Sequence, residues 1–208
     1  MEVKYFGNSC FRIKGKDIVL ITNPFNSSLG IKLSGLTADL VLFSSKKDSK
    51  ENSSLVKDAL NRKETFIIDE PGEYEVGGAF VLAIPFDNKT IYIITVDGMR
   101  LAFLGEISQK IAEKELEEID GVDILFLPVG GNSVITEKQA AYIQEKIQPN
   151  IIIPMSFKIP SLKMEFNEVD EFLKEVGAEG LNPVDKLLIA KDRLPLEKEV
   201  ILLNAKTN

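Results

Sequence analysis

Residues 40–52 read LVLFSSKKDSKEN, an apolar run followed by a small and charged one. Four consecutive apolar residues, 40–43, are typical of a strand that is buried on both of its faces. The run stops at Ser44, and serine, lysine and carboxylate side chains follow it. Because segments that follow buried strands often carry binding and catalytic residues, this stretch predicts a strand that delivers polar groups to a functional site.

Strand patterns continue on both sides of this stretch. Short runs rich in β-branched and aromatic residues predict strands at residues 3–6, 11–13, 17–21, 40–43, 65–68, 79–84, 90–96 and 99–103. Later runs predict strands at 124–128, 151–154 and 200–203, with helices at 111–119, from a capping box at Thr136 to about 147, and from a cap at Asn167 to Gly177. No repeat or linker separates these elements, so we predict one α/β domain over residues 1–208.

Composition excludes several classes of function. The 208 residues carry a net charge of −7, which argues against nucleic-acid binding because that function needs a basic face. No apolar run approaches the roughly 20 residues of a membrane span. The beginning of the chain has no signal-peptide pattern, and the single cysteine, Cys10, fits a reducing compartment. We therefore expect a cytoplasmic protein that binds neither membrane nor nucleic acid.

The chain contains no histidine. Histidine is the commonest metal ligand in proteins and the commonest general base near neutral pH. With one cysteine and no histidine, a single chain cannot assemble a zinc site from Cys and His ligands. Any chemistry here must therefore rely on other side chains.

Polar or turn residues follow the apolar runs at recurrent positions. The segments are Gly7-Asn8-Ser9, Thr22-Asn23-Pro24-Phe25, residues 44–52, Pro71-Gly72-Glu73-Tyr74, Leu104-Gly105-Glu106, Pro128-Val129-Gly130-Gly131 and Pro154-Met155-Ser156. In this order and with this spacing, the chain resembles the metallo-β-lactamase-fold hydrolases, in particular the branch similar to the ascorbate-6-phosphate lactonases. The resemblance implies a four-layer αββα sandwich with its site at one rim.

The family's metal ligands are the part of the resemblance that this chain lacks. The His-x-His-x-Asp-His motif that follows the strand at 40–43 falls on Ser45, Lys47, Ser49 and Lys50, and Asp48 stands one place from the expected carboxylate. Other positions that match the family's ligand and site loops hold Asn8, Asn23, Glu106 and Ser156. The resemblance thus implies the fold of a zinc hydrolase, and the residues predict that zinc, any other cofactor and catalytic residues are missing.

The loss matters because zinc lowers the pKa of a bound water from about 15.7 to about 7. We therefore expect a non-catalytic binding or scaffolding protein that self-associates or pairs with an active relative. The alternative is a hydrolase of a small anionic or phosphorylated substrate that uses a carboxylate-bound metal or no metal. A third interpretation is an anion-binding module that uses the lysines of residues 44–52.

Several features leave two interpretations open. Lys47 and Lys50 either replace the metal charge and pair with Glu106 or point into solvent. An all-oxygen cation site from Asp48, Asp69, Glu73 and Glu106 is a further hypothesis. Cys10 is either a nucleophile or a core residue. Gly130-Gly131-Asn132 either binds an anion before the following helix or forms a tight turn.

Overall fold

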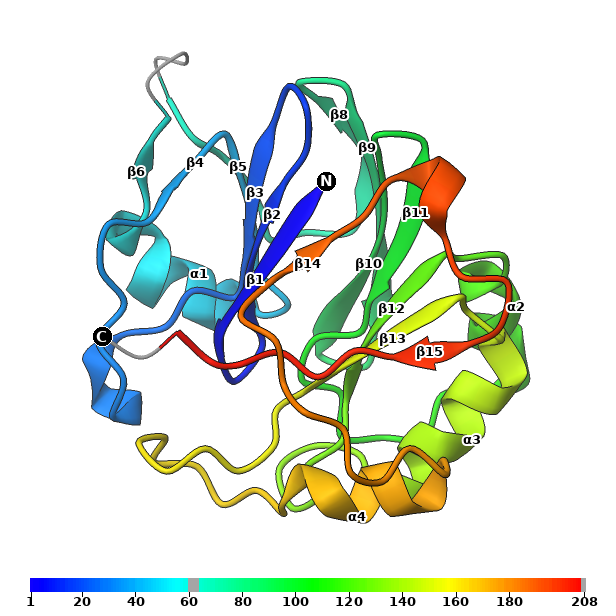
Figure 1. Cartoon of the computed structure of the whole chain (residues 1–208). Helices are drawn as coiled ribbons and strands as arrows, with labels where there is room; N and C mark the ends of the chain where they lie inside the picture. Colours follow the sequence, from blue (N-terminus) through cyan, green and yellow to red (C-terminus); the bar gives the residue numbers. More distant parts are fainter. Residues whose placement is uncertain (60–63, 207–208) are drawn as a thin grey trace.

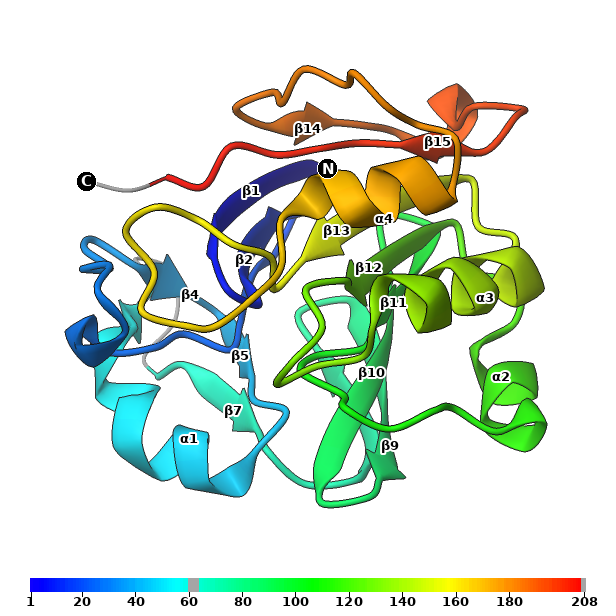
Figure 2. The ribbon, with the colours of Figure 1, turned by 90° about the horizontal axis from the view of Figure 1, so that it is seen from below.

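The computed structural model describes residues 1–59 and 64–206, and it shows two β-sheets packed face to face with helices outside them (Figures 1 and 2). The first sheet has six strands in the order β14-β1-β2-β3-β5-β7, and the second has seven in the order β15-β13-β12-β11-β10-β9-β8. The predicted αββα sandwich is confirmed. The predicted domain span, 1–208, includes residues 60–63 and 207–208, which lie outside the described residues.

The first sheet changes from antiparallel to parallel pairing at its centre. Strands β1, β2 and β3 form an antiparallel meander, and β5 and β7 continue it in parallel. The strands are β1 (Glu2–Gly7), β2 (Cys10–Lys14), β3 (Val19–Thr22), β5 (Leu40–Leu42), β7 (Phe66–Ile68) and β14 (Leu187–Leu188). A separate parallel pair joins β4 (Thr37–Ala38) to β6 (Lys57–Asp58).

The second sheet has the same mixed pattern. Strands β8 to β11 pair antiparallel, and β12, β13 and β15 follow in parallel. The strands are β8 (Gly72–Val76), β9 (Ala79–Phe86), β10 (Lys89–Val96), β11 (Met99–Phe103), β12 (Ile124–Pro128), β13 (Ile151–Met155) and β15 (Glu199–Val200). The Asp97-Gly98 turn joins β10 to β11, as its sequence predicts, because both residues have the positive φ that this hairpin turn needs.

The helices lie on the outer sides of the sheets. They are α1 (Lys46–Asn52), α2 (Glu113–Ile119), α3 (Glu137–Ile147) and α4 (Val169–Glu175), with 3₁₀ turns η1 (Ser27–Leu29), η2 (Ser53–Leu55) and η3 (Lys191–Arg193). Helices α3 and α4 run side by side outside the second sheet, whereas α1 lies beside the first sheet (Figures 1 and 2). None of the helices in the described part of the chain is long and apolar enough to cross a membrane.

Strand β5 shows why the run at 40–43 decides the fold. Leu40 and Leu42 face the large apolar core, while Val41 and Phe43 face a second cluster on the outer side of the first sheet. Because side chains alternate along a strand, only a continuous apolar run can fill both layers. All four residues are buried, as predicted.

Some predicted boundaries and elements are wrong. Residues 46–52 form helix α1 rather than a loop, because the Ser45 side chain accepts a hydrogen bond from the Asp48 backbone N–H and caps the helix. Asn167 is not a cap: Glu168 holds that position, and Asn167 donates to Glu171 instead. The polar-looking segment 72–76 is edge strand β8, and the last strand covers only Glu199–Val200 of the second sheet.

Candidate functional site

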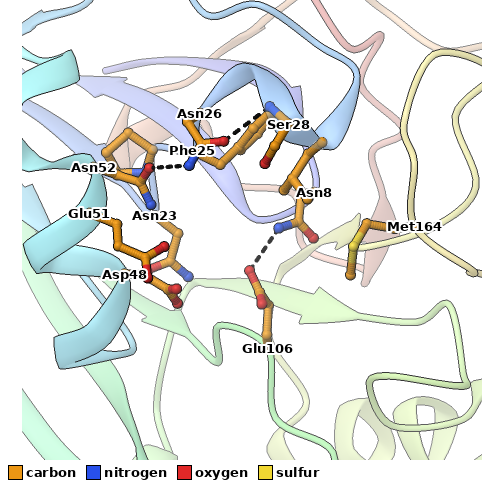
Figure 3. Close-up of a pocket in the computed structure, with 12 residues that line it drawn as sticks. Asn8, Asn23, Phe25, Asn26, Ser28, Asp48, Glu51, Asn52, Glu106 and Met164 are labelled. Atoms are coloured by element: carbon orange, nitrogen blue, oxygen red, sulfur yellow. Dashed lines mark hydrogen bonds between the residues drawn. The ribbon is translucent and has the colours of Figure 1, made fainter.

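A cavity of about 200 Å³ opens where β1, β3 and β11 end and α1 begins. Figure 3 shows side chains from these separate elements turned toward one another around it. The lining residues are Asn8, Asn23, Pro24, Phe25, Asn26, Ser28, Leu29, Asp48, Glu51, Asn52, Glu106 and Met164. Of the predicted site residues, Asn8, Asn23, Asp48 and Glu106 line this cavity.

Glu106 is held by two donors from the turn between β1 and β2. Its Oε1 accepts a hydrogen bond from Asn8 Nδ2 at 2.8 Å (Figure 3) and one from Ser9 Oγ at 2.6 Å. Asn8 is 3% exposed and Ser9 is fully buried. Hydrogen bonds to an ionised carboxylate are short and strong, so these contacts fix the carboxylate at the bottom of the cavity.

Asn23 continues the same network toward the end of β5. Its Nδ2 donates to Ser9 Oγ at 3.1 Å and to Ser44 Oγ at 3.2 Å, and its Oδ1 accepts from the Ser44 backbone N–H at 2.7 Å. We call Asn8, Ser9, Asn23, Ser44 and Glu106 the floor network. Every one of these side chains makes at least one hydrogen bond within it.

The backbone around the floor network is strained and tightly braced. Asn8, Asn23 and Ser156 have positive φ values of 53°, 36° and 53°. Asparagine tolerates this region better than most residues, but serine does not, so surrounding contacts must hold it. The Asn8 carbonyl accepts from the Tyr5 hydroxyl at 2.9 Å and from the Ser156 backbone N–H at 2.8 Å. Ser156 thus positions the Asn8 turn and does not line the cavity.

Gly105 allows the closest approach in the site. A Cβ added there would lie 2.1 Å from Ser44 Oγ, and the residue has a φ of +59°. Both the contact and the backbone conformation therefore require glycine. This approach brings β11 and Glu106 against the end of β5.

Helix α1 supplies a different kind of surface to the same cavity. Asp48 and Glu51, one turn apart, line it, and we call this pair the acidic wall. Lys47 and Lys50 are exposed and are not among the lining residues. The ion-pair interpretation is not supported, because no ion pair of the described residues joins either lysine to the Glu106 carboxylate. Both lysines are exposed to solvent, as the other interpretation predicts.

The remaining candidates take structural roles. Ser45 caps α1, and Ser49 is one of the buried residues of that helix. Cys10 is fully buried, and burial raises the pKa of its thiol, which favours the core interpretation. Gly131 has a φ of +62°, and its carbonyl oxygen accepts a hydrogen bond from the Val134 backbone N–H. Both features favour the turn interpretation.

The sequence did not predict several residues of the site. Ser44 belongs to the floor network and does not line the cavity, and its position directly after the buried run is a sequence signal that β5 ends at this network. Asn52 accepts a hydrogen bond from Asn26 at 3.0 Å and closes the far side of the cavity (Figure 3). Neither Glu51 nor Met164 could be identified from the sequence. A charged residue on a helix is usually solvated, and a methionine in a loop usually fills space.

The donor set does not fit the zinc centre that the fold implies. Zinc takes four ligands, chiefly Cys sulfur and His nitrogen, with carboxylate oxygen as the third choice. Around this cavity the donors are amides, hydroxyls and three carboxylates, and the Oε1 atom of Glu106 already accepts two hydrogen bonds. Within residues 1–59 and 64–206, no three His, Cys, Asp or Glu side chains are grouped so as to hold a metal ion. Asp48, Asp69, Glu73 and Glu106 are therefore not grouped closely enough to share one ion, as the cation-site hypothesis requires.

Comparison with known proteins identifies the family. The model of the beta-lactamase superfamily domain matches residues 2–156, about three quarters of the chain and all of the cavity except Met164. The chain belongs to the beta-lactamase superfamily. Helix α4 and the strands β14 and β15 lie beyond the matched segment.

Several relatives are named as hydrolases. Two proteins named UPF0173 metal-dependent hydrolase, from Thermococcus onnurineus and Carboxydothermus hydrogenoformans, are 24% and 23% identical to this chain. The matches cover 85% and 91% of this chain and 92% and 100% of those proteins. These names favour the hydrolase alternative over the non-catalytic interpretation. The narrower placement near the ascorbate-6-phosphate lactonases stays a prediction.

Solved structures agree on the fold over the whole length. A crystal structure from Thermotoga maritima, assigned as a Zn-dependent hydrolase of the metallo-beta-lactamase superfamily, superposes with a TM-score of 0.83. It is 27% identical, and the match covers 98% of both chains. The metallo hydrolase Igni18 from Ignicoccus hospitalis has the same fold, with a TM-score of 0.63 at 18% identity, and the match covers 89% of this chain and 97% of that one.

Proposed function

We propose that this chain is a metal-free member of a family of metal-dependent hydrolases, and that it uses the old site to bind a small molecule without hydrolysing it. The floor network carries this proposal. Asn8, Asn23 and Glu106 stand at positions that match the family's metal-ligand and site loops, and their side chains hydrogen-bond to one another or to the neighbouring Ser9 and Ser44. A site built to bind an ion through these positions would direct its donor atoms at the ion instead.

Chemistry supports the same conclusion. Hydrolysis by this family's route needs a hydroxide, and this chain has neither histidine ligands for a metal that would generate one nor a histidine that removes a proton from water. The fully buried Cys10, with its raised thiol pKa, does not replace them as a nucleophile. We derive no hydrolytic step from this arrangement.

A hydrolase with a carboxylate-bound metal is the second candidate. The names of the relatives support it, and so does one observation within this chain: Asp48, Glu51 and Glu106 line a single cavity. Oxygen donors of this kind suit Mg²⁺, Ca²⁺ or Mn²⁺ better than zinc. For this candidate, side chains of α1 would have to move toward Glu106 when a metal binds.

Thermal unfolding with and without metal separates the two candidates. A ligand present at 100 times its Kd stabilises the native state by about 2.7 kcal/mol, which raises the Tm of a chain this size by roughly 5–10 °C. The protein should be tag-free, because a histidine tag would bind zinc itself. Our proposal expects the same Tm with chelator and with excess zinc, manganese or magnesium. A rise of several degrees with one metal, lost in Asp48→Asn and in Glu106→Gln, would support the second candidate instead.

A further inference from the structure

We propose that the cavity between the floor network and the acidic wall binds a small organic cation that carries amine N–H donors. This inference rests on the proposed function, in that the cavity is available to a ligand only when no metal ion fills it. It replaces the anionic ligand that the lysines of residues 44–52 suggested. Charge, an unpartnered buried acceptor and the shape of the cavity support it.

The charges that line the cavity are all negative. Asp48, Glu51 and Glu106 are acidic, and none of the lining residues is a lysine or an arginine. The basic residues of α1 are directed elsewhere: Lys46 pairs with Glu70, and Lys47 and Lys50 are exposed outside the lining. An anion in this cavity would meet three carboxylates without compensation, whereas a cation would find a partner on two of its sides.

A buried acceptor in the same cavity has no partner. Asn8 is 3% exposed, and its Oδ1 makes no hydrogen bond. Its Nδ2 donates to Glu106, and this contact fixes which end of the amide is nitrogen and which is oxygen. Figure 3 shows the oxygen turned away from Glu106 Oε1 and toward the side where Met164 lies. An unpartnered buried acceptor is costly, so a donor that reaches it gains binding energy.

The shape of the cavity selects a molecule over an ion. The three carboxylates come from α1 and from the end of β11, and no three acidic groups of the described chain are close enough to share one ion. Phe25, Leu29 and Met164 add apolar surface to the lining. A short alkyl chain with an ammonium group at each end would place its carbons on this surface and its N–H groups on the carboxylates. At about 200 Å³ the cavity is smaller than the range typical of drug-sized ligands, so the ligand is small.

Titration calorimetry with putrescine, a linear diamine, tests the proposal on the wild-type protein. Butanediol, which has the same chain length and no charge, and succinate, which has the opposite charge, serve as matched ligands. We expect putrescine to bind with one ligand per chain, and neither butanediol nor succinate to bind at the same concentrations. Absence of putrescine binding, or tighter binding of succinate, would overturn the proposal.

Two variants locate the binding site, and a third controls for net charge. Glu51→Gln and Asp48→Asn remove one negative charge each from the acidic wall, and neither side chain belongs to the floor network. Each should weaken putrescine binding by about tenfold or more, since a hydrogen bond to a charged group contributes about 1.5–3 kcal/mol. Glu145→Gln removes the same charge from an exposed position on α3 and should leave the affinity unchanged. Equal weakening by all three variants would mean general attraction to an acidic protein and would overturn the site.

Failure of this inference is distinguishable from failure of the proposed function. If the protein binds a metal ion tightly and putrescine competes with it, the metal-free function is wrong and the cation site is only the metal site. If neither metal nor putrescine binds, the metal-free function stands and the choice of ligand is wrong. Retention of putrescine binding in the presence of excess chelator supports both.

Discussion

The floor network and the acidic wall border one cavity but differ in almost every physical respect. The floor network is formed by strand ends, its members apart from Glu106 are buried, and its side chains bond to one another at 2.6–3.2 Å. The acidic wall lies on a short helix, and no hydrogen bond or ion pair of the described residues involves the side chains of Asp48 or Glu51. The floor network is therefore held in place by its own hydrogen bonds, and the wall is a surface whose carboxylates are free to bind.

This difference indicates what happened to the site of the family. Of the positions that match the family's metal-ligand and site loops, Asn8, Asn23 and Glu106 belong to the floor network and Asp48 to the acidic wall, while Lys47 and Lys50 are exposed outside the cavity lining. A buried polar group must have a hydrogen-bond partner, so amides and hydroxyls that replace ligands at strand ends bond to each other. Exposed helix positions are under no such constraint and tolerate any charge.

The largest effect on stability is expected at Gly105, where the floor network allows no extra atom. Gly105→Ala places a Cβ against Ser44 Oγ and forces alanine into a left-handed conformation. We expect the free energy of unfolding to fall by about 2–4 kcal/mol, the sum of the backbone cost and the overpacking cost. Urea denaturation measures it. A loss below about 1 kcal/mol would mean that Ser44 moves freely and that the floor network is loose.

A somewhat smaller loss is expected when the carboxylate of the floor network is removed. Glu106→Ala leaves the donors of Asn8 and Ser9 without an acceptor, and we expect a loss of about 2 kcal/mol. Glu106→Gln keeps an acceptor oxygen and should lose less than half as much. Equal losses in the two variants would show that the negative charge, rather than the hydrogen bonds, holds the network together.

The smallest effect is expected on the exposed face of α1. Lys47→Ala and Lys50→Ala should each change the free energy of unfolding by about 0.5 kcal/mol or less, the range of ordinary surface substitutions. The same urea experiment serves. A loss above about 1 kcal/mol in either variant would contradict the solvent interpretation and would favour the interpretation in which that lysine compensates the charge of Glu106.

Local signals in the sequence, apolar runs and turn residues, predicted most of the strands, whereas the four layers came from the family resemblance. The run at 40–43, the Asp97-Gly98 turn and the capping box at Thr136 all have the structure that they predict. Edge strand β8 was missed because its residues alternate between exposed and partly buried and begin at Pro71-Gly72, which is typical of a turn.

The sequence predicted which residues lie at the site but not which of them contact one another. The family pattern placed Asn8, Asn23 and Glu106 at one rim, and the structure brings them together. It could not show that Ser44 and Ser9 join them, because these bonds connect residues up to 97 positions apart. Nor could it show that α1 turns its carboxylates inward and its lysines outward, since that depends on where the helix begins. Ser45 sets that beginning.

The metal content per chain tests the central claim most directly. Tag-free protein should be incubated with excess zinc and manganese, passed through a desalting column and measured by inductively coupled plasma mass spectrometry. The floor network predicts far less than one metal ion per chain, both before and after incubation, and no difference between wild type and Glu106→Gln. A value near one ion per chain that falls in Glu106→Gln would contradict the account. It would mean that the chain binds a metal ion through Glu106, as a metal-dependent hydrolase would.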